Sequence, residues 1–173
     1  MKWLLIVLGA LVVLGIVAVA VGYSLPVKHT ARRSATISAP DSAVWAVITD
    51  PGAFPGWRGK VASVELLPSV EGRQSWREKG SDGAITYEVM RAEPPRRLVT
   101  RIADRDLPFG GEWEYELAPD GSGTRITITE RGEVYNPIFR FVSRFLMGHT
   151  ATIDDYLRAL GRRFGQEVEP VSA

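Results

Sequence analysis

The sequence predicts an α+β fold: a curved antiparallel sheet of about seven strands, two short helices after the first strand and a long C-terminal helix, preceded by one N-terminal transmembrane helix. Three observations lead to this prediction. An apolar run occupies residues 3–22, six strand-like segments lie between residues 61 and 131, and residues 136–163 carry apolar side chains at helical spacing. Short turn-forming clusters separate the six segments, and short connections join only antiparallel neighbours.

The N-terminal segment, residues 1–27, has the composition of a membrane anchor. Its run from Trp3 to Gly22 contains no charged or strongly polar residue and would span roughly 30 Å as a helix, the thickness of the hydrocarbon layer. The alternative is a cleaved signal peptide, for which Ala18-Val19-Ala20 offers a cleavage site. Because the run exceeds the roughly 7–15 apolar residues of a signal peptide, we expect a retained single-pass anchor that contacts the membrane through residues 3–22.

The charges that flank the apolar run favour a cytoplasmic position for the rest of the chain. Lys28, Arg32 and Arg33 follow the run, whereas only Lys2 and the terminal amine precede it. Basic residues concentrate on the cytoplasmic side of membrane helices. The sequence therefore predicts a membrane protein whose domain faces the cytoplasm.

Composition excludes several classes of protein. The chain has 173 residues, with 21 basic and 20 acidic ones, and the single basic residue of segment 1–27 is Lys2, so the remainder carries no net charge. A nucleic-acid-binding protein needs a basic surface, so we expect this protein to have no nucleic-acid partner. The chain has no cysteine and only His29 and His149, which argues against disulfides, thiol nucleophiles and a metal centre. We expect no metal and no cofactor.

Residues 28–165 are expected to form one compact domain, with a flexible tail over 166–173. A first strand over 30–38 is followed by a short helix that starts near Pro40, and residues 51–57 allow no more than a helical turn. Strands are then expected at 61–67, 74–79, 84–92, 97–104, 110–117 and 124–131.

Two hairpins allow their register to be predicted. If Leu117 lies opposite Thr124, apolar residues align on one face of the hairpin and charged residues on the other. This register brings Glu130 opposite Gly111, on the inward face of the sheet. In the hairpin that turns at residues 93–96, the expected register places Ala92 opposite Arg97 and pairs Tyr87 with Ile102.

The last predicted element is one long helix. Asn136 is a good N-cap, Pro137 suits the first helical position, and the helical pattern continues to about Arg163. The residues of its inward face are expected to be Ile138, Val142, Phe145, His149, Thr152 or Ile153, Tyr156 and Leu160.

Five segments carry a resemblance to a known superfamily: residues 35–50, 54–57 (Phe-Pro-Gly-Trp), 93–98, 113–117 (Trp-Glu-Tyr-Glu-Leu) and 123–130. The chain resembles the SRPBCC or START-like superfamily, and most closely its polyketide cyclase/dehydrase and lipid-transport type. The resemblance implies a helix-grip fold, in which the curved sheet wraps around the C-terminal helix and encloses an apolar cavity. Members range from lipid carriers to cyclases and co-chaperones, so the fold alone does not select a function.

Three residues are candidates for acid–base chemistry in such a cavity. Glu130 shares the inward face of its strand with Ile128, and Glu78 shares that of its strand with Trp76. His149 lies on the inward face of the predicted helix, where an imidazole can transfer a proton. Each has a structural alternative: Glu130 turned to solvent or paired with an arginine, Glu78 as an edge-strand charge and His149 as a core side chain.

The residues expected to contact a ligand are the polar candidates and the larger side chains of the same faces. They are Trp76, Trp113, Tyr115, Ile128, Glu130, Phe145, His149, Thr152 and Tyr156.

Three functions are compatible with this sequence. The first is a membrane-anchored binding module that holds a hydrophobic small molecule or lipid, which would enter from the bilayer. The second is a cyclase- or dehydratase-like enzyme, which requires two of the three acid–base candidates to converge on one substrate. The third is a protein-interaction module, whose mark would be a closed cavity and an exposed apolar patch. We favour a binding protein over an enzyme.

Overall fold

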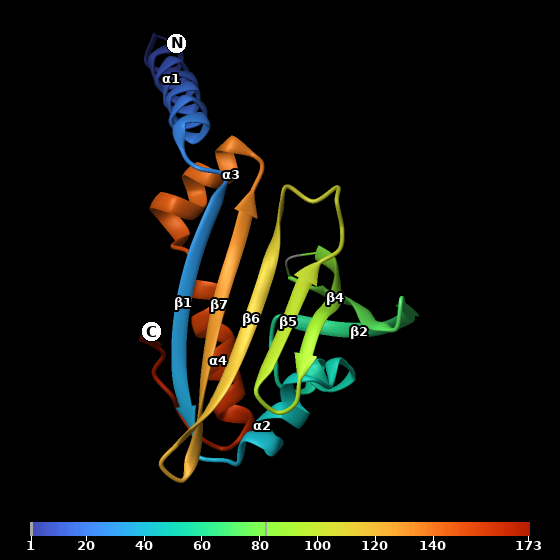
Figure 1. Cartoon of the computed structure of the whole chain (residues 1–173). Coiled ribbons are helices and arrows are strands. Elements are labelled where there is room, and N and C mark those ends of the chain that lie inside the picture. The colour runs from blue at the N-terminus through green and yellow to red at the C-terminus, as the bar shows by residue number, and fades with distance from the viewer. Residues whose placement is uncertain (1, 82) are drawn as a thin grey trace.

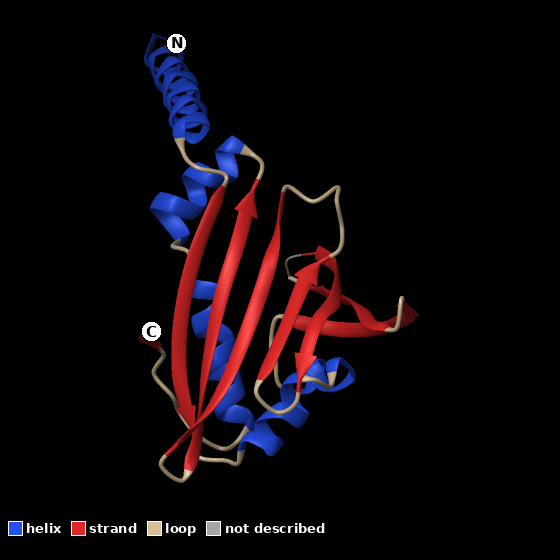
Figure 2. Cartoon of the chain, in the orientation of Figure 1, coloured by secondary structure: helices blue, strands red, loops and turns tan. Residues whose placement is uncertain are grey.

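A computed structural model describes residues 2–81 and 83–173 of the chain (Figures 1 and 2). Helix α1 (Lys2–Ser24) extends away from a sheet-and-helix domain, and all of residues 2–17 are exposed. By length and composition α1 can cross a membrane, a property that it shares with signal sequences. The predicted N-terminal helix is therefore present.

The domain is built on one eight-stranded antiparallel sheet with the order β2-β3-β4-β5-β6-β7-β1-β8. Its curvature leaves a concave face that α4 (Ala151–Arg163) covers (Figure 2). The helix-grip fold is thus confirmed. The strands are β1 (Lys28–Ile37), β2 (Val61–Val70), β3 (Arg73–Gly80), β4 (Gly83–Glu93), β5 (Arg97–Ile102), β6 (Phe109–Asp120), β7 (Gly123–Val134) and β8 (Val171–Ser172).

The main hydrophobic core lies between the concave face and the helices. Helix α4 buries Ile153, Tyr156, Leu157 and Leu160, which recur at the spacing of one helical face. They pack against inward residues of β1, β5, β6 and β7, and α2 (Asp41–Ile48) adds its own buried face. The short 3₁₀ helix η1 (Pro51–Gly56) follows α2 as the expected helical turn.

The predicted register of the β6–β7 hairpin is wrong by two residues. Asp120 lies opposite Gly123, so the turn is tighter than expected and Leu117 faces Ile126. A shift of two residues keeps every side chain on its predicted face because the side-chain period of a strand is two. Glu130 therefore points inward as expected, but its cross-strand neighbour is Trp113.

The β4–β5 hairpin pairs Tyr87 with Ile102, as predicted. Nearer the turn, however, Ala92 lies opposite Leu98, one residue from the expected partner. An irregularity between Val89 and Arg91 absorbs the difference, because a bulge inserts one extra residue into one strand.

The predicted continuous C-terminal helix is interrupted. Helix α3 (Pro137–Val142) is capped by the Asn136 side chain and continues into one π-helical turn, η2 (Ser143–Met147). Gly148 then adopts a φ of 76°, a conformation that non-glycine residues avoid, and α4 starts at Ala151. The interruption ends the common helical face, so Ile138 and Phe145, which were expected inside, are 51% and 58% exposed.

The predicted flexible tail is also held against the domain. Pro170 is buried, its carbonyl accepts a hydrogen bond from Arg33, and β8 pairs with β1. Arg33 also binds Asp154 of α4 at 2.6 Å. Arg33 thus joins strand, helix and tail, a set of contacts that local composition does not reveal.

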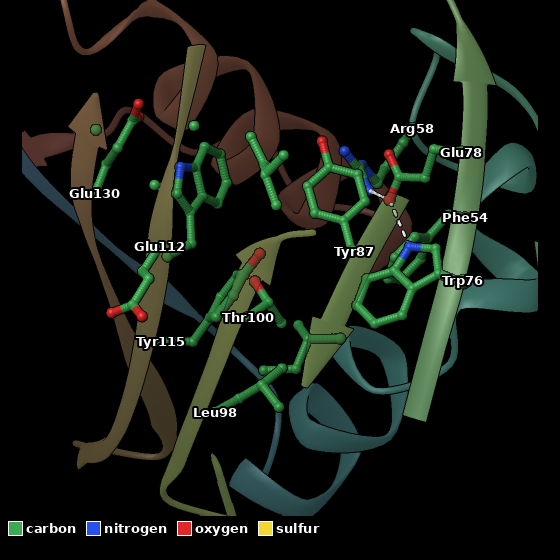
Figure 3. A pocket seen from close by; sticks show the side chains of 16 residues that line it. Phe54, Arg58, Trp76, Glu78, Tyr87, Leu98, Thr100, Glu112, Tyr115 and Glu130 are labelled. Carbon is green, nitrogen blue, oxygen red and sulfur yellow. Dashed lines mark hydrogen bonds and ion pairs between the residues drawn. The ribbon is translucent and has the colours of Figure 1, made fainter. Parts of the chain in front are cut away.

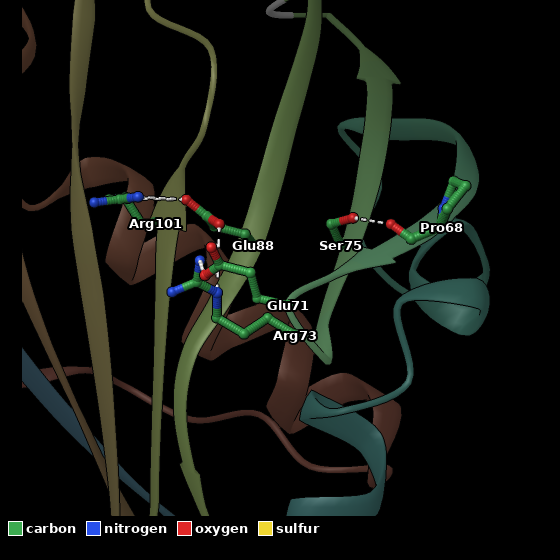
Figure 4. Close-up of polar contacts among 6 residues, drawn as sticks. All are labelled: Pro68, Glu71, Arg73, Ser75, Glu88 and Arg101. Carbon is green, nitrogen blue, oxygen red and sulfur yellow. Dashed lines mark hydrogen bonds and ion pairs between the residues drawn. The ribbon is translucent and has the colours of Figure 1, made fainter.

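Ion pairs cover much of the outer face of the sheet. Glu88 on β4 contacts both Arg101 of β5 and Arg73 of β3, and Arg73 also binds Glu71 (Figure 4). The outer face is therefore polar, and the inner face is the one that can enclose an apolar site.

Candidate functional site

A cavity of about 90 Å³ lies on the concave face of the sheet. Its volume is below the roughly 300–1,000 Å³ of pockets that hold drug-sized ligands, so it accommodates a small molecule or one end of a longer one. Figure 3 shows its labelled walls, which come from strands β3 to β7, η1 and the loop after η1. The lining includes Ile48, Phe54, Arg58, Trp76, Glu78, Tyr87, Leu98, Thr100, Ile102, Glu112, Trp113, Tyr115 and Glu130.

The inner end of the cavity holds a buried ion pair. Arg58 donates from Nη1 to Glu78 Oε1 at 2.7 Å, and the indole N–H of Trp76 donates to the same oxygen at 2.9 Å (Figure 3). The guanidinium also lies over the rings of Phe54 and Tyr156. Burial by itself lowers the pKa of Arg58, but the Glu78 carboxylate together with Tyr156 and Tyr115 outweighs burial, so the net shift of this pKa is upward and the guanidinium stays charged.

Aromatic rings fill the space between the cavity and α4. The ring of Tyr156 contacts Trp57, Trp113 and Tyr115, with centroids 5.3–5.7 Å apart. Burial raises the pKa of Tyr115 to about 12 and that of Tyr156 well above its usual value, so both hydroxyls are protonated. Within the described chain, neither the Tyr156 hydroxyl nor the Trp57 indole N–H has a hydrogen-bond partner of standard geometry.

The opposite end of the cavity is its mouth, where Glu130 lies beside both histidines of the chain. Glu130 Oε1 is 3.5 Å from His29 Nε2, and the His29 ring stacks on His149 with centroids 4.0 Å apart. A Cβ at Gly132 would come within 2.3 Å of the His29 ring, so glycine makes room for this cluster. We call Glu130, His29 and His149 the mouth cluster.

The mouth of the cavity continues into a wider, open depression of about 720 Å³. Both spaces are bordered by Gly110, Gly111 and Gly132, whose lack of side chains leaves the passage open. The depression is polar, with Lys28, Arg101 and other charged residues around it. A ligand in the cavity can therefore extend towards solvent at this end.

Acidification is expected to destabilise the mouth cluster. Burial lowers the pKa of His149, the neighbouring His29 and Arg144 lower it further, and Glu130 only partly opposes them. Below the pKa of about 6.5 of an unfolded histidine, the unfolded chain binds a proton more readily than the folded one. The stability that neutral His149 contributes is therefore present above about pH 6.5 and lost as the pH falls through that value. We expect the melting temperature to fall between pH 7.5 and 5.5, and to fall less in His149→Gln; an equal fall in both proteins would contradict this assignment.

One family matches most of the chain: residues 28–165 match the family described as polyketide cyclase/dehydrase and lipid transport. The chain belongs to this family. None of the curated proteins matches the chain. The SRPBCC/START-like resemblance that the sequence motifs suggested is thus confirmed.

Solved structures share the fold of this polyketide cyclase/dehydrase and lipid-transport family member at low sequence identity. A START superfamily protein from Mycobacterium smegmatis is 17% identical, with a TM-score of 0.64 over 79% of this chain and 97% of that one. The ZhuI aromatase/cyclase from Streptomyces sp. R1128 is 15% identical, with a TM-score of 0.62 over 80% and 94%. A conserved protein from Geobacillus kaustophilus is 18% identical, with a TM-score of 0.67 over 82% and 99%.

The structure brings together some of the sequence-predicted residues and separates others. Glu78 and Glu130 both line the cavity of this family member, but at opposite ends (Figure 3), whereas Glu130 and His149 meet through His29. Trp76, Trp113 and Tyr115 also line the cavity, and Tyr156 packs against its wall.

Three predicted ligand contacts lie elsewhere. Ile128 is fully buried in the core, and Phe145 is exposed because the helix is interrupted at Gly148. Thr152 is exposed in the first turn of α4 and borders a separate surface depression beside Arg58. The helix interruption thus removes Phe145 from the cavity, whereas Thr152 lies on the exposed side of α4.

Sequence reasoning missed several residues of the site. Arg58 follows a short helical turn, and His29 lies at the start of β1, just before the strand predicted over residues 30–38, so neither lies in a predicted periodic element. Only the folded chain brings them to Glu78 and Glu130. Thr100, by contrast, carried a usable signal, because it alternates with the inward-facing Leu98 on β5.

Proposed function

We propose that the protein binds a hydrophobic small molecule, or the apolar end of a lipid, in this cavity while α1 anchors it in a membrane. The carrying observation is the lining: aromatic and aliphatic side chains form the walls together with the buried Thr100 and Tyr115, and the two charges at the inner end neutralise each other in the Arg58–Glu78 pair. Such sites hold the apolar body of a ligand and orient it by few polar contacts. A carbonyl or carboxylate on the ligand would find the Arg58 guanidinium at the inner end.

The position of the mouth supports entry from the bilayer. Gly110 and Gly111 lie near the start of β6 and Gly132 near the end of β7, at the end of the sheet that is closest to α1 (Figure 1). A lipophilic ligand would therefore pass from membrane to cavity through little water. The basic residues over 28–33 support a cytoplasmic position for the domain.

A cavity-filling substitution tests the proposal. Thr100 is buried and lines the cavity, so Thr100→Phe is expected to occupy the binding space and to weaken ligand binding at least about tenfold, or about 1.4 kcal/mol. Delipidated full-length protein in detergent would be titrated with fluorescent fatty acids, phospholipids and polyaromatic compounds, with native mass spectrometry to detect co-purified ligand.

Thr36→Phe is the matched control, because it makes the same chemical change at an exposed residue of β1 that borders neither the cavity nor the depression at its mouth. It is expected to leave binding unchanged. Absence of saturable binding of every probe by the unmodified protein would refute the proposed function.

Proton transfer at the mouth is a second candidate function. The close approach of Glu130 to His29, with His149 stacked behind, supplies two of the three predicted acid–base groups at one end of the cavity. One structural neighbour is named an aromatase/cyclase. If the protein is an enzyme of this type, Glu130→Gln is expected to abolish turnover while the bound ligand is retained; loss of binding alone would favour the first function.

A further inference from the structure

A cluster of large apolar side chains is exposed on the domain next to α1. Ile138 and Phe139 of α3 and Phe145 of η2 are 51%, 52% and 58% exposed. Exposed single apolar residues are ordinary, but three large ones within eight residues of one helical segment indicate an apolar partner. We call Pro137–Met147 the α3–η2 segment.

The α3–η2 segment is joined tightly to the end of α1. A Cβ at Gly22 would lie 2.0 Å from the carbonyl oxygen of Pro137, so the two helices touch through their backbones. Arg140 donates to the carbonyl of Leu25 at 2.8 Å, and its guanidinium lies near the Tyr23 ring. Figure 1 shows α3 directly at the C-terminal end of α1. The segment therefore has a defined height relative to the membrane helix.

That height coincides with the edge of the hydrocarbon layer. The apolar run of α1 ends at Gly22, and at 1.5 Å per residue only about 3 Å of helix separates Gly22 from Ser24. Tyr23, 69% exposed, occupies the position at which aromatic side chains concentrate in membrane proteins. A helix that contacts Gly22 is thus at the level of the lipid headgroups.

We propose that the α3–η2 segment lies on the bilayer surface and inserts Ile138, Phe139 and Phe145 among the lipids. The composition fits this partner, since interfacial helices combine apolar residues with basic ones, and the exposed Arg144 lies in the same segment. The proposed partner of these apolar side chains is the same membrane that α1 enters, so α1 and the α3–η2 segment would contact one lipid surface. This inference rests on the proposal that α1 spans the bilayer.

The contact would fix the orientation of the domain as well as its attachment. The mouth cluster includes His149, which directly follows the interruption after η2, and His29, which is one residue into β1. Attachment at both α1 and the α3–η2 segment therefore holds the mouth of the cavity close to the membrane surface.

Site-specific labelling tests the inference. The chain contains no cysteine, so Phe139→Cys and Phe145→Cys each give one attachment point for an NBD fluorophore on the full-length protein in phosphatidylcholine/phosphatidylglycerol liposomes. We expect blue-shifted emission and loss of most of the fluorescence with doxyl-labelled lipids, but little loss with aqueous iodide. Leu66→Cys is the matched control, because Leu66 is equally exposed at 61% but lies on β2; its label is expected to behave in the opposite way.

A third position separates this inference from membrane anchoring. A label at Val12→Cys, within α1, reports whether the helix is in the bilayer. Lipid quenching at residue 12 with water-like labels at 139 and 145 would refute the surface contact while the anchor stands. Water-like labels at all three positions would overturn both, whereas ligand titration of the detergent-solubilised protein would still measure the cavity independently.

Discussion

Replacing Glu78 by glutamine is expected to lower the free energy of unfolding by about 3 kcal/mol. The carboxylate is the only ion-pair partner found for Arg58 among the described residues, and the side chains of Arg58 and Glu78 are 21% and 10% exposed. Removing one member of a buried pair leaves the other charge uncompensated, which is the costly change. The partial exposure of Arg58 places the expected value at the lower end of the roughly 3–5 kcal/mol range for such losses. Guanidinium unfolding followed by tryptophan fluorescence would measure it.

The double variant Arg58→Met/Glu78→Leu separates the charge from the packing. Because it removes both charges and keeps apolar volume, it is expected to lose less stability than Glu78→Gln, and the cost that remains is the buried Trp76 indole N–H, which no longer has this acceptor. Glu116→Gln is the surface control: the Arg32–Glu116 pair is about half exposed, so its loss is expected to cost less than about 1 kcal/mol. Equal losses in the free energy of unfolding for Glu78→Gln and Glu116→Gln would show that the Arg58–Glu78 pair behaves like a surface ion pair.

The elements of the domain were predictable where local pattern and packing agree. The inward positions of Trp76, Trp113 and Tyr115 follow from strand alternation alone, which holds even where the β6–β7 register is shifted by two residues. The shift itself depends on how tightly residues 120–123 turn, and several turn lengths satisfy the same hydrophobic pattern.

The C-terminal region was less predictable because its conformation depends on distant contacts. The apolar spacing from Asn136 to Arg163 suits one helix, yet the left-handed conformation of Gly148 divides it. Phe145 is exposed, which is unfavourable for a helix in water. The proposed contact with lipid would account for this exposure. The spacing of apolar residues along the chain does not reveal such a partner. The tail contacts Arg33, which is 137 residues away from Pro170 in the chain.

The candidate site was predictable only in part, again because some of its contacts join residues that are distant in the sequence. Glu78 and Glu130 were found because they continue inward faces of strands, whereas Arg58 and His29, which decide what those carboxylates contact, lie outside regular alternation or at the end of a strand. Charge pairing between strands and loops depends on the tertiary fold, so the sequence left the role of each carboxylate open.

Gly111→Ala is expected to lower the free energy of unfolding by about 2–4 kcal/mol, since it combines backbone strain with a backbone clash. Gly111 has a φ of 130°, a region in which side chains are strongly disfavoured. An added Cβ would also lie 2.3 Å from the carbonyl oxygen of Arg131, an atom of the neighbouring strand that cannot move without disturbing the β6–β7 ladder. The same displacement would disturb the mouth of the cavity, so weaker ligand binding is expected with the loss of stability.

Gly110→Ala is the internal control, because it makes the same chemical change at the adjacent residue. Its Cβ would meet only the hydroxyl end of the Tyr135 side chain, at 2.7 Å, and that side chain is 46% exposed and able to turn away. The loss of unfolded-state entropy favours alanine by about 0.4–1 kcal/mol and offsets this adjustment. We therefore expect a change in stability within about 1 kcal/mol for Gly110→Ala. Comparable losses in the two variants would mean that the strand start is deformable, and that the conformation of Gly111 does not determine the shape of the mouth.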